Sequence, residues 1–186
     1  GRGNLPKHGL VRTRPWQLMA QTETSLIMAI SDDPGTRELW PYEFELMQTP
    51  ILDEQGLSIA LDVYNRSESP MVFTGALHTY LRVPDVTACA LAGLDGCEYQ
   101  DAADDGRYKT QNGDLRISAE VDRVFADAPS ALMLQKGNDK TLRIEKGGFS
   151  DTVVWCPGPE LAATFTDMPV EDWQRMLCVE AAAAAQ

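Results

Sequence analysis

Short runs in which apolar and polar residues alternate recur along the 186-residue chain, and turn-forming residues separate them. The clearest run covers residues 57–63, where Leu57, Ile59, Leu61 and Val63 are the apolar members. Because successive side chains of a strand point to opposite faces of a sheet, a period of two indicates a half-buried strand. Alternation of this kind restricts the chain to folds built from sheets.

Five further stretches share this alternation or a composition rich in β-branched and aromatic residues: 42–48, 115–121, 142–144, 152–155 and 176–179. Helical periodicity is weak, with one short turn expected at 170–173 and no element expected in the terminal alanine run. Many short strands separated by Gly, Pro, Asn and Asp predict an all-β fold, either a sandwich or a barrel.

Composition indicates an ordinary globular protein, and its length predicts a single domain over residues 1–186. The net charge of −12 argues against nucleic acid or an anionic membrane as a partner. The longest weakly polar run, residues 87–94, is far shorter than the roughly 20 residues that span a bilayer. The first ten residues lack the apolar core of a signal peptide, so we expect a cytoplasmic protein, and a monomer.

Neither the cysteines nor the acidic runs match a metal-binding spacing. The four cysteines are Cys89, Cys97, Cys156 and Cys178. They form no C-x-x-C pair and no zinc-like spacing with His8 or His78, so we expect reduced, buried thiols. The acidic run 101–105 lacks the spacing and the closing glutamate of a calcium loop and predicts a solvated turn.

One of the two histidines, His78, lies in a strand-like stretch, residues 72–83. A histidine in a strand is either a buried core residue or a working acid or base. Counting by two places the following residues on one face: Val72, Thr74, Ala76, His78, Tyr80 and Arg82. The opposite, apolar face holds Phe73, Gly75, Leu77, Thr79, Leu81 and Val83. The hydroxyl-rich, cationic face of His78 favours the acid or base over the core residue.

A second candidate acid or base, Glu180, closes a nearly apolar stretch. Leu177 and Val179 share one face of this stretch, while Met176 and Cys178 share the other with Glu180. Partial burial there would raise the pKa of the carboxyl group toward the range useful for a general base. The same pattern fits a surface glutamate at the end of a strand equally well.

Two more segments combine residues suited to binding a polar ligand. Asp122 ends a polar face whose other members are Arg116, Ser118 and Glu120. His8 precedes Gly9, a residue that permits a close approach of the backbone. Arg12 is the cation nearest to His8 that can bind an anion with two hydrogen bonds.

Six segments occur together, and in the same order, in one family: HGLVRTRPWQL, HTYLRVPDV, ACALAGLDGCEYQD, EVDRVF, GGFSDTVVW and MLCVEAA. From residue 8 to residue 182 the chain therefore resembles the hexose-6-phosphate mutarotases, also called glucose-6-phosphate 1-epimerases. That group is similar to the aldose 1-epimerases or galactose mutarotases. The resemblance implies a large antiparallel β-sandwich of the galactose-mutarotase type, in agreement with the alternation of residues.

The resemblance also implies an isomerase that interconverts the α and β anomers of a hexose 6-phosphate such as glucose 6-phosphate. By motif, it implies that His78 is the general acid and Glu180 the general base. These residue types suit the reaction, since one group must remove the proton of the C1 hydroxyl while another protonates the ring oxygen. A carboxylate and an imidazolium suffice, so we expect no metal and no other cofactor.

Substrate binding is implied in the same way for three residues, His8, Arg12 and Asp122. The small-molecule partner would be a sugar phosphate, and its phosphate calls for arginine side chains. Arg12 and Arg82 are the candidates, because each lies close in sequence to a histidine of the motifs.

The chain departs from the family pattern in two respects. It reads Trp155-Cys156-Pro157 where the family usually has Trp-Asn-Pro. Family members also carry a segment before the His-Gly motif and at least one strand after the last motif, so we expect a chain truncated at both ends.

Two other interpretations compete with the enzyme. The chain fits a non-catalytic carbohydrate-binding β-sandwich that keeps the sugar contacts without the chemistry. It also fits an incomplete fragment that has no activity by itself. The presence of both His78 and Glu180 favours the enzyme over the binding module.

Overall fold

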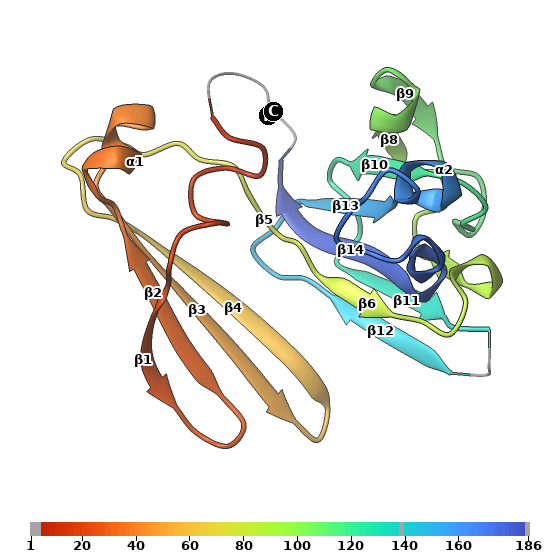
Figure 1. Cartoon of the computed structure of the whole chain (residues 1–186), viewed down its shortest axis with the longest axis horizontal. Coiled ribbons are helices and arrows are strands. Elements are labelled where there is room, and N and C mark those ends of the chain that lie inside the picture. Colours follow the sequence, from red (N-terminus) through yellow and green to blue (C-terminus); the bar gives the residue numbers. More distant parts are fainter. Residues whose placement is uncertain (1–4, 138–139, 185–186) are drawn as a thin grey trace. The chain divides into compact units, whose positions relative to one another are not determined.

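The computed structural model describes residues 5–137 and 140–184, and it consists mainly of antiparallel strands with a few short helices (Figure 1). This architecture confirms the all-β prediction. The chain forms two compact units, residues 1–73 and 74–186, which are described separately below. The assignment of a single domain to residues 1–186 stays a prediction. Within the described residues, no helix has the length and apolar character needed to cross a membrane.

The first unit is a four-stranded antiparallel meander in the order β1-β2-β3-β4 (Figure 1). Its strands are β1 (Gln17–Gln21), β2 (Leu26–Ser31), β3 (Phe44–Asp53) and β4 (Gly56–Asn65). In β4, Ile59, Leu61 and Val63 are half-buried while the residues between them are exposed, as the alternation predicts, but Leu57 of the same set is exposed. The strand predicted at 42–48 extends to Asp53, because β3 pairs with β4 along all ten of its residues.

Between β2 and β3 lies a short helix, α1 (Pro34–Leu39), which was not predicted. A capping box begins it: the Thr36 amide donates to the Asp33 carboxylate, and the Asp33 amide donates to the Thr36 hydroxyl. Six residues are too few to produce a visible helical period. The cap residues and Pro34 at the first helical position are therefore the signals for α1 in the sequence.

The second unit contains two antiparallel sheets (Figure 1). The larger, seven-stranded sheet has the order β5-β14-β13-β10-β8-β9, with β6 also paired to β14. Its strands are β5 (Gly75–Leu77), β6 (Tyr80–Arg82), β8 (Glu98–Asp101), β9 (Arg107–Thr110), β10 (Val121–Phe125), β13 (Asp151–Cys156) and β14 (Met176–Ala183). The smaller sheet, in the order β12-β11-β7, consists of β7 (Ala90–Ala92), β11 (Ala131–Gln135) and β12 (Thr141–Glu145).

Short helical segments connect several of these strands. They are η1 (Val86–Ala88), η2 (Ala102–Asp104), α2 (Gly158–Ala162) and η3 (Val170–Arg175). The η3 segment confirms the helical turn predicted at 170–173. The terminal alanines 181–183 belong to β14, so that strand is longer than the predicted 176–179.

One hydrophobic core joins the two sheets of the second unit. Leu91 of β7 and Leu134 of β11 belong to the same buried cluster as Phe125, Val154 and Leu177 of the larger sheet. The unit is therefore a β-sandwich. Because side chains alternate along a strand, every second residue of β10, β13 and β14 points away from this core.

The strand predicted over 115–121 is wrong for most of its length. Leu115 forms only an isolated bridge with Leu91, and β10 begins at Val121. Leu115 and Ile117 are nevertheless buried in the core. Alternating burial along an extended chain thus produced the strand pattern without a ladder of hydrogen bonds.

The acidic run 101–105 was predicted to be solvated, and this is wrong for its first residue. Asp101 is buried at the end of β8 and pairs with the Lys109 ammonium at 2.8 Å. The same ammonium lies 2.7 Å from Asp104. Asp101 and Asp104 of this run thus both form ion pairs with Lys109, which lies on β9 of the same sheet.

Gly158, at the start of α2, permits a close contact that no other residue allows. Its φ is +63°, and a Cβ there would lie 2.4 Å from the Glu120 nitrogen and 2.7 Å from the Ala119 carbonyl carbon. We expect Gly158→Ala to destabilise the protein by more than the roughly 1–2 kcal/mol of the left-handed backbone alone. Thermal unfolding measures the loss.

Gly113 provides the matched control for this substitution. Its φ of +65° is nearly the same, but a Cβ there would meet no atom of the described residues within 4 Å. Gly113→Ala carries only the backbone cost, so its melting temperature should fall less than that of Gly158→Ala. Equal shifts for the two variants would contradict the steric explanation.

Candidate active site

The strand-like stretch that contains His78 is not a single strand. It forms β5 and β6, and the ladder is interrupted at His78 and Thr79. The Thr79 amide donates to the Leu77 carbonyl at 2.9 Å, a local bond that removes this amide from the ladder, while the Thr79 carbonyl still accepts from the Val179 amide of β14 at 3.3 Å. The prediction of one continuous strand over 72–83 is therefore wrong at the residue of most interest.

The interruption leaves the register with β14 unchanged, and this sets His78 opposite Glu180. The flanking partners are Leu77 with Ala181 on one side and Tyr80 with Cys178 on the other. His78 Nε2 lies 3.3 Å from Glu180 Oε1, within ion-pair distance when the imidazole is protonated. The side chain of Glu180 is 7% exposed and that of His78 is 29% exposed. The pair therefore has one partly open side.

This pair lies on the face of the larger sheet that is turned away from the core. Leu177 and Val179 belong to the core cluster, so Cys178 and Glu180 of the same strand point the other way. The register continues the same face across the sheet. Cys178 lies beside Trp155 of β13, and Trp155 lies beside Asp122 of β10. The structure thus brings Asp122 onto the face of the pair, whereas counting along the sequence predicted only that it lies opposite the apolar residues of its own stretch.

Two aromatic rings flank the imidazole. The Tyr80 ring stacks on His78 with centroids 4.8 Å apart and planes inclined by 22°. The Trp155 ring meets His78 edge-on at 6.0 Å and Tyr80 at 6.4 Å. Trp155 was not among the predicted site residues. The strand predicted at 152–155 contained the signal, but only the register with β14 places that residue beside the histidine.

Burial changes the acidity of the Glu180 carboxyl group. Loss of hydration in this buried position raises its pKa to about 7, and the nearby Asp122 carboxylate contributes in the same direction. On the side away from His78, Glu180 pairs with the apolar Val153 of β13. A carboxyl group with a pKa near neutrality can both accept and release a proton under ordinary conditions.

A buried thiol lies next to this carboxyl group. Burial raises the pKa of Cys178, and the charge of Glu180 raises it further. Ligand atoms of Cys178, His78 and Glu180 all lie within 4.8 Å of one another. All four cysteines of the chain are free thiols.

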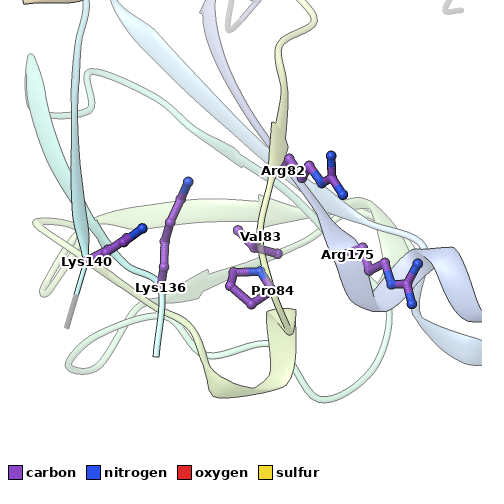
Figure 2. Close-up of a pocket in the computed structure, with 6 residues that line it drawn as sticks. All are labelled: Arg82, Val83, Pro84, Lys136, Lys140 and Arg175. Carbon is purple, nitrogen blue, oxygen red and sulfur yellow. The ribbon is translucent and has the colours of Figure 1, made fainter. Parts of the chain in front are cut away.

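Arg82, the predicted phosphate ligand on β6, lies at a basic pocket of about 380 Å³. The lining residues are Arg82, Val83, Pro84, Lys136, Lys140 and Arg175. Figure 2 shows the two lysines, from the β11–β12 hairpin, on one side of the Val83–Pro84 segment and the two arginines on the other. Arg82 pairs with Met176 of β14, two residues along β6 from Tyr80. Four cations thus gather at this pocket of an acidic chain.

His8 and Arg12 belong to the first unit and precede β1. Both side chains are exposed. The backbone is left-handed at His8 and Gly9, with φ of 65° and 79°, and the Gly9 amide donates to the Pro6 carbonyl at 2.9 Å. The close approach expected at Gly9 is not seen among the described residues, since a Cβ there would have no neighbour within 4 Å. The binding roles of His8 and Arg12 stay predictions.

Comparison with known proteins identifies the family. The profile of the aldose 1-epimerase family matches residues 1–185, so the chain belongs to this family. A protein of Cenchrus ciliaris named "Putative glucose-6-phosphate 1-epimerase" is 30% identical, and the match covers 97% of this chain and 59% of that protein. A protein of Escherichia coli strain K12 with the same name is 28% identical over 98% of this chain and 62% of that protein.

Among solved structures, a "putative mutarotase" from Salmonella typhimurium is similar to this chain with a TM-score of 0.85 and 24% identity. The match covers 97% of this chain and 61% of that structure. The chain thus spans about three fifths of the length of the relatives it matches. These findings confirm the resemblance and the galactose-mutarotase-like β-sandwich that it implied.

The raised pKa of Glu180 predicts a pH dependence of stability. The folded protein holds this proton up to about pH 7, whereas the unfolded chain releases it near 4.5. The native state therefore binds more protons between these values, and the free energy of unfolding falls as the pH rises through this range. The contribution, at most about 3 kcal/mol, is fully present below pH 4.5 and lost above pH 7.

Urea unfolding of wild type and Glu180→Gln between pH 4.5 and 8 measures this contribution as the difference between two slopes. The neutral amide cannot titrate, so the variant should lose less stability than wild type as the pH rises. Glu98→Gln, at an exposed position of β8 in the same sheet, should keep the slope of wild type. Parallel curves for wild type and Glu180→Gln would contradict a raised pKa.

Proposed function

We propose that this protein is a mutarotase that interconverts the α and β anomers of a hexose 6-phosphate, with glucose 6-phosphate as the first substrate to test. The observation that carries the proposal is the 3.3 Å approach of His78 Nε2 to Glu180 Oε1 on the face of the sheet turned away from the core. Membership of the aldose 1-epimerase family supports the reaction class.

Anomerisation requires an acid and a base at one carbon. Glu180 takes the proton of the C1 hydroxyl while His78 protonates the ring oxygen, and the C1–ring oxygen bond breaks to leave an open-chain aldehyde. After rotation about C1–C2, the C5 hydroxyl adds to the other face of the aldehyde: His78 takes back the proton of that hydroxyl, and Glu180 returns its proton to the C1 oxygen. Both oxygens are bonded to C1, so the acid and the base must lie close together, as this pair does.

The aromatic rings beside the pair suit a sugar. Tyr80 is 57% exposed and stacks on the imidazole, and Trp155 is half-buried. Such rings offer flat apolar surfaces to the C–H groups of a pyranose. Asp122, on the same face, supplies a fixed acceptor for a sugar hydroxyl. These residues would hold C1 against the acid and the base.

Specificity for a phosphorylated sugar is proposed from two observations. The relatives from Cenchrus ciliaris and Escherichia coli are both named "Putative glucose-6-phosphate 1-epimerase". The second unit also has a basic pocket at Arg82, on the strand that carries Tyr80. In a chain of net charge −12, a phosphate needs such a local group of cations. Arg12 is the second candidate ligand.

Removal of either catalytic group should slow the reaction. We expect His78→Asn and Glu180→Gln each to reduce anomer exchange on glucose 6-phosphate by about 10²–10⁴-fold, the usual contribution of a general acid or base. NMR exchange spectroscopy, corrected for the spontaneous rate, measures the loss. Glu98→Gln, an exposed change in the same sheet, serves as the control with full activity.

The same measurement decides between the enzyme and the alternatives. A wild-type chain that binds sugar phosphate but exchanges anomers only at the spontaneous rate would favour the non-catalytic carbohydrate-binding module. A chain without binding or exchange would favour the inactive fragment. The cytoplasmic location and the monomeric state stay predictions from the sequence.

The phosphate ligands are tested by comparing two substrates. Arg12→Ala and Arg82→Ala should each raise KM for glucose 6-phosphate by roughly tenfold, because a charge-assisted hydrogen bond is lost, and leave glucose nearly unaffected. Arg143→Ala is the matched control, since this exposed arginine of β12 pairs with Glu145 and does not line the basic pocket. Equal losses on both sugars would remove the substituted arginine from the phosphate site.

A further inference from the structure

A cysteine, Cys178, lies beside the proposed acid and base, and the proposed reaction does not use it. Cys178 precedes Glu180 by two residues on β14, so both side chains point to the same face of the sheet. Ligand atoms of Cys178, Glu180 and His78 lie within 4.8 Å of one another. It is the only group of three metal-ligating side chains found among the described residues.

The three side chains offer sulfur, nitrogen and oxygen, the ligand atoms of protein zinc sites. With bonds of about 2.0–2.3 Å in a tetrahedral arrangement, zinc ligands lie roughly 3.3–3.8 Å apart. The 3.3 Å between His78 Nε2 and Glu180 Oε1 already fits this range. Distances of up to 4.8 Å to the third atom require movements of only about 1 Å, within the reach of side-chain rotation.

We propose that Cys178, His78 and Glu180 form a binding site for Zn²⁺, and that the bound metal ion is a reversible inhibitor of the enzyme. The binding half of this proposal is independent of the proposed function, and the inhibition half rests on it. Three protein ligands leave the fourth position of the metal to water.

The choice of zinc follows from the ligand types. Thiolate sulfur favours thiophilic ions, whereas Mg²⁺ and Ca²⁺ prefer oxygen ligands in larger number. Coordination by sulfur releases the Cys178 thiol proton to solvent, and the lone pairs of His78 and Glu180 then bind the metal. Neither group can transfer a proton in that state. Inhibition therefore follows from the coordination itself, without a change of fold.

Metal binding is tested with Co²⁺, which replaces Zn²⁺ and reports sulfur coordination by a thiolate-to-metal charge-transfer band. We expect the wild-type chain to show this band and to lose it when one equivalent of Zn²⁺ is added. Cys178→Ser should lack the band and bind Zn²⁺ at least about tenfold more weakly in calorimetry, since a ligand is missing. If Cys178→Ser fails to fold, His78→Asn takes its place in the test. This variant removes a more exposed ligand and should also weaken Zn²⁺ binding.

Cys97→Ser is the matched control, because Cys97 is a partly buried thiol outside the three-residue group. It should keep both the band and the affinity for Zn²⁺. A band that survives in Cys178→Ser, or no band in wild type, would overturn the proposed site.

Inhibition is measured separately, by anomer exchange at saturating Zn²⁺ and again after removal of the metal with EDTA. We expect exchange to stop with Zn²⁺ and to recover with EDTA. Exchange that continues at saturation, in a protein that shows the cobalt band, would overturn the inhibition half alone. A chain with the band but no exchange at any metal concentration would instead count against the proposed function and leave the metal site standing.

Discussion

The pairing of β14 is the constraint on which the second unit depends. This strand lies between β13 on one side and the two short strands β5 and β6 on the other. Six of its eight residues are buried, among them the unbroken run from Met176 to Glu180. One face supplies Leu177 and Val179 to the core, and the other supplies Cys178 and Glu180 to the site. A shift of the strand by one residue would exchange these two faces, so core packing itself fixes the direction of the site residues.

The same burial gives the site its chemical character. A carboxyl group that is removed from water on a strand of the sheet, beside Val153 and near Asp122, holds its proton more tightly than it would in solution. The opening in the ladder at His78 has the complementary effect. It leaves the imidazole partly exposed while the unchanged register keeps it against Glu180. Glu180 is thus shielded from water, whereas His78 is accessible to a ligand.

Much of this site could be predicted from the sequence, because a strand period of two assigns residues to faces without any knowledge of neighbours. Counting by two placed His78 and Asp122 on polar faces and Glu180 on the face opposite Leu177 and Val179, and the family resemblance implied roles for all three in one candidate site. The closeness of Trp155 and Cys178 to His78 could not be predicted in this way, because it depends on which strands pair and in which register. The spacing of residues along the chain could not reveal the proposed zinc ligands either, since His78 lies about one hundred residues before Cys178 and Glu180.

The wrong predictions have physical causes of the same kind. The alternation at Leu115 and Ile117 reports burial, and burial needs only an extended backbone. The ladder that defines a strand needs a partner, which the sequence pattern does not contain. The break at His78 was hidden for a related reason. Thr79 makes a local hydrogen bond that leaves the flanking residues in register, so composition gives no sign of it.

Gly158 has no functional group, yet its contact has a consequence for the site. Its backbone touches that of residues 119 and 120, just before β10 begins, and it follows β13 by two residues. The contact therefore keeps the end of β13, which carries Trp155, close to the start of β10, which carries Asp122. A search for active-site residues that ranks side chains by their chemistry would pass over this position. The spacing of Asp122 and Trp155 in the candidate site thus depends, in part, on the absence of a single methyl group at Gly158.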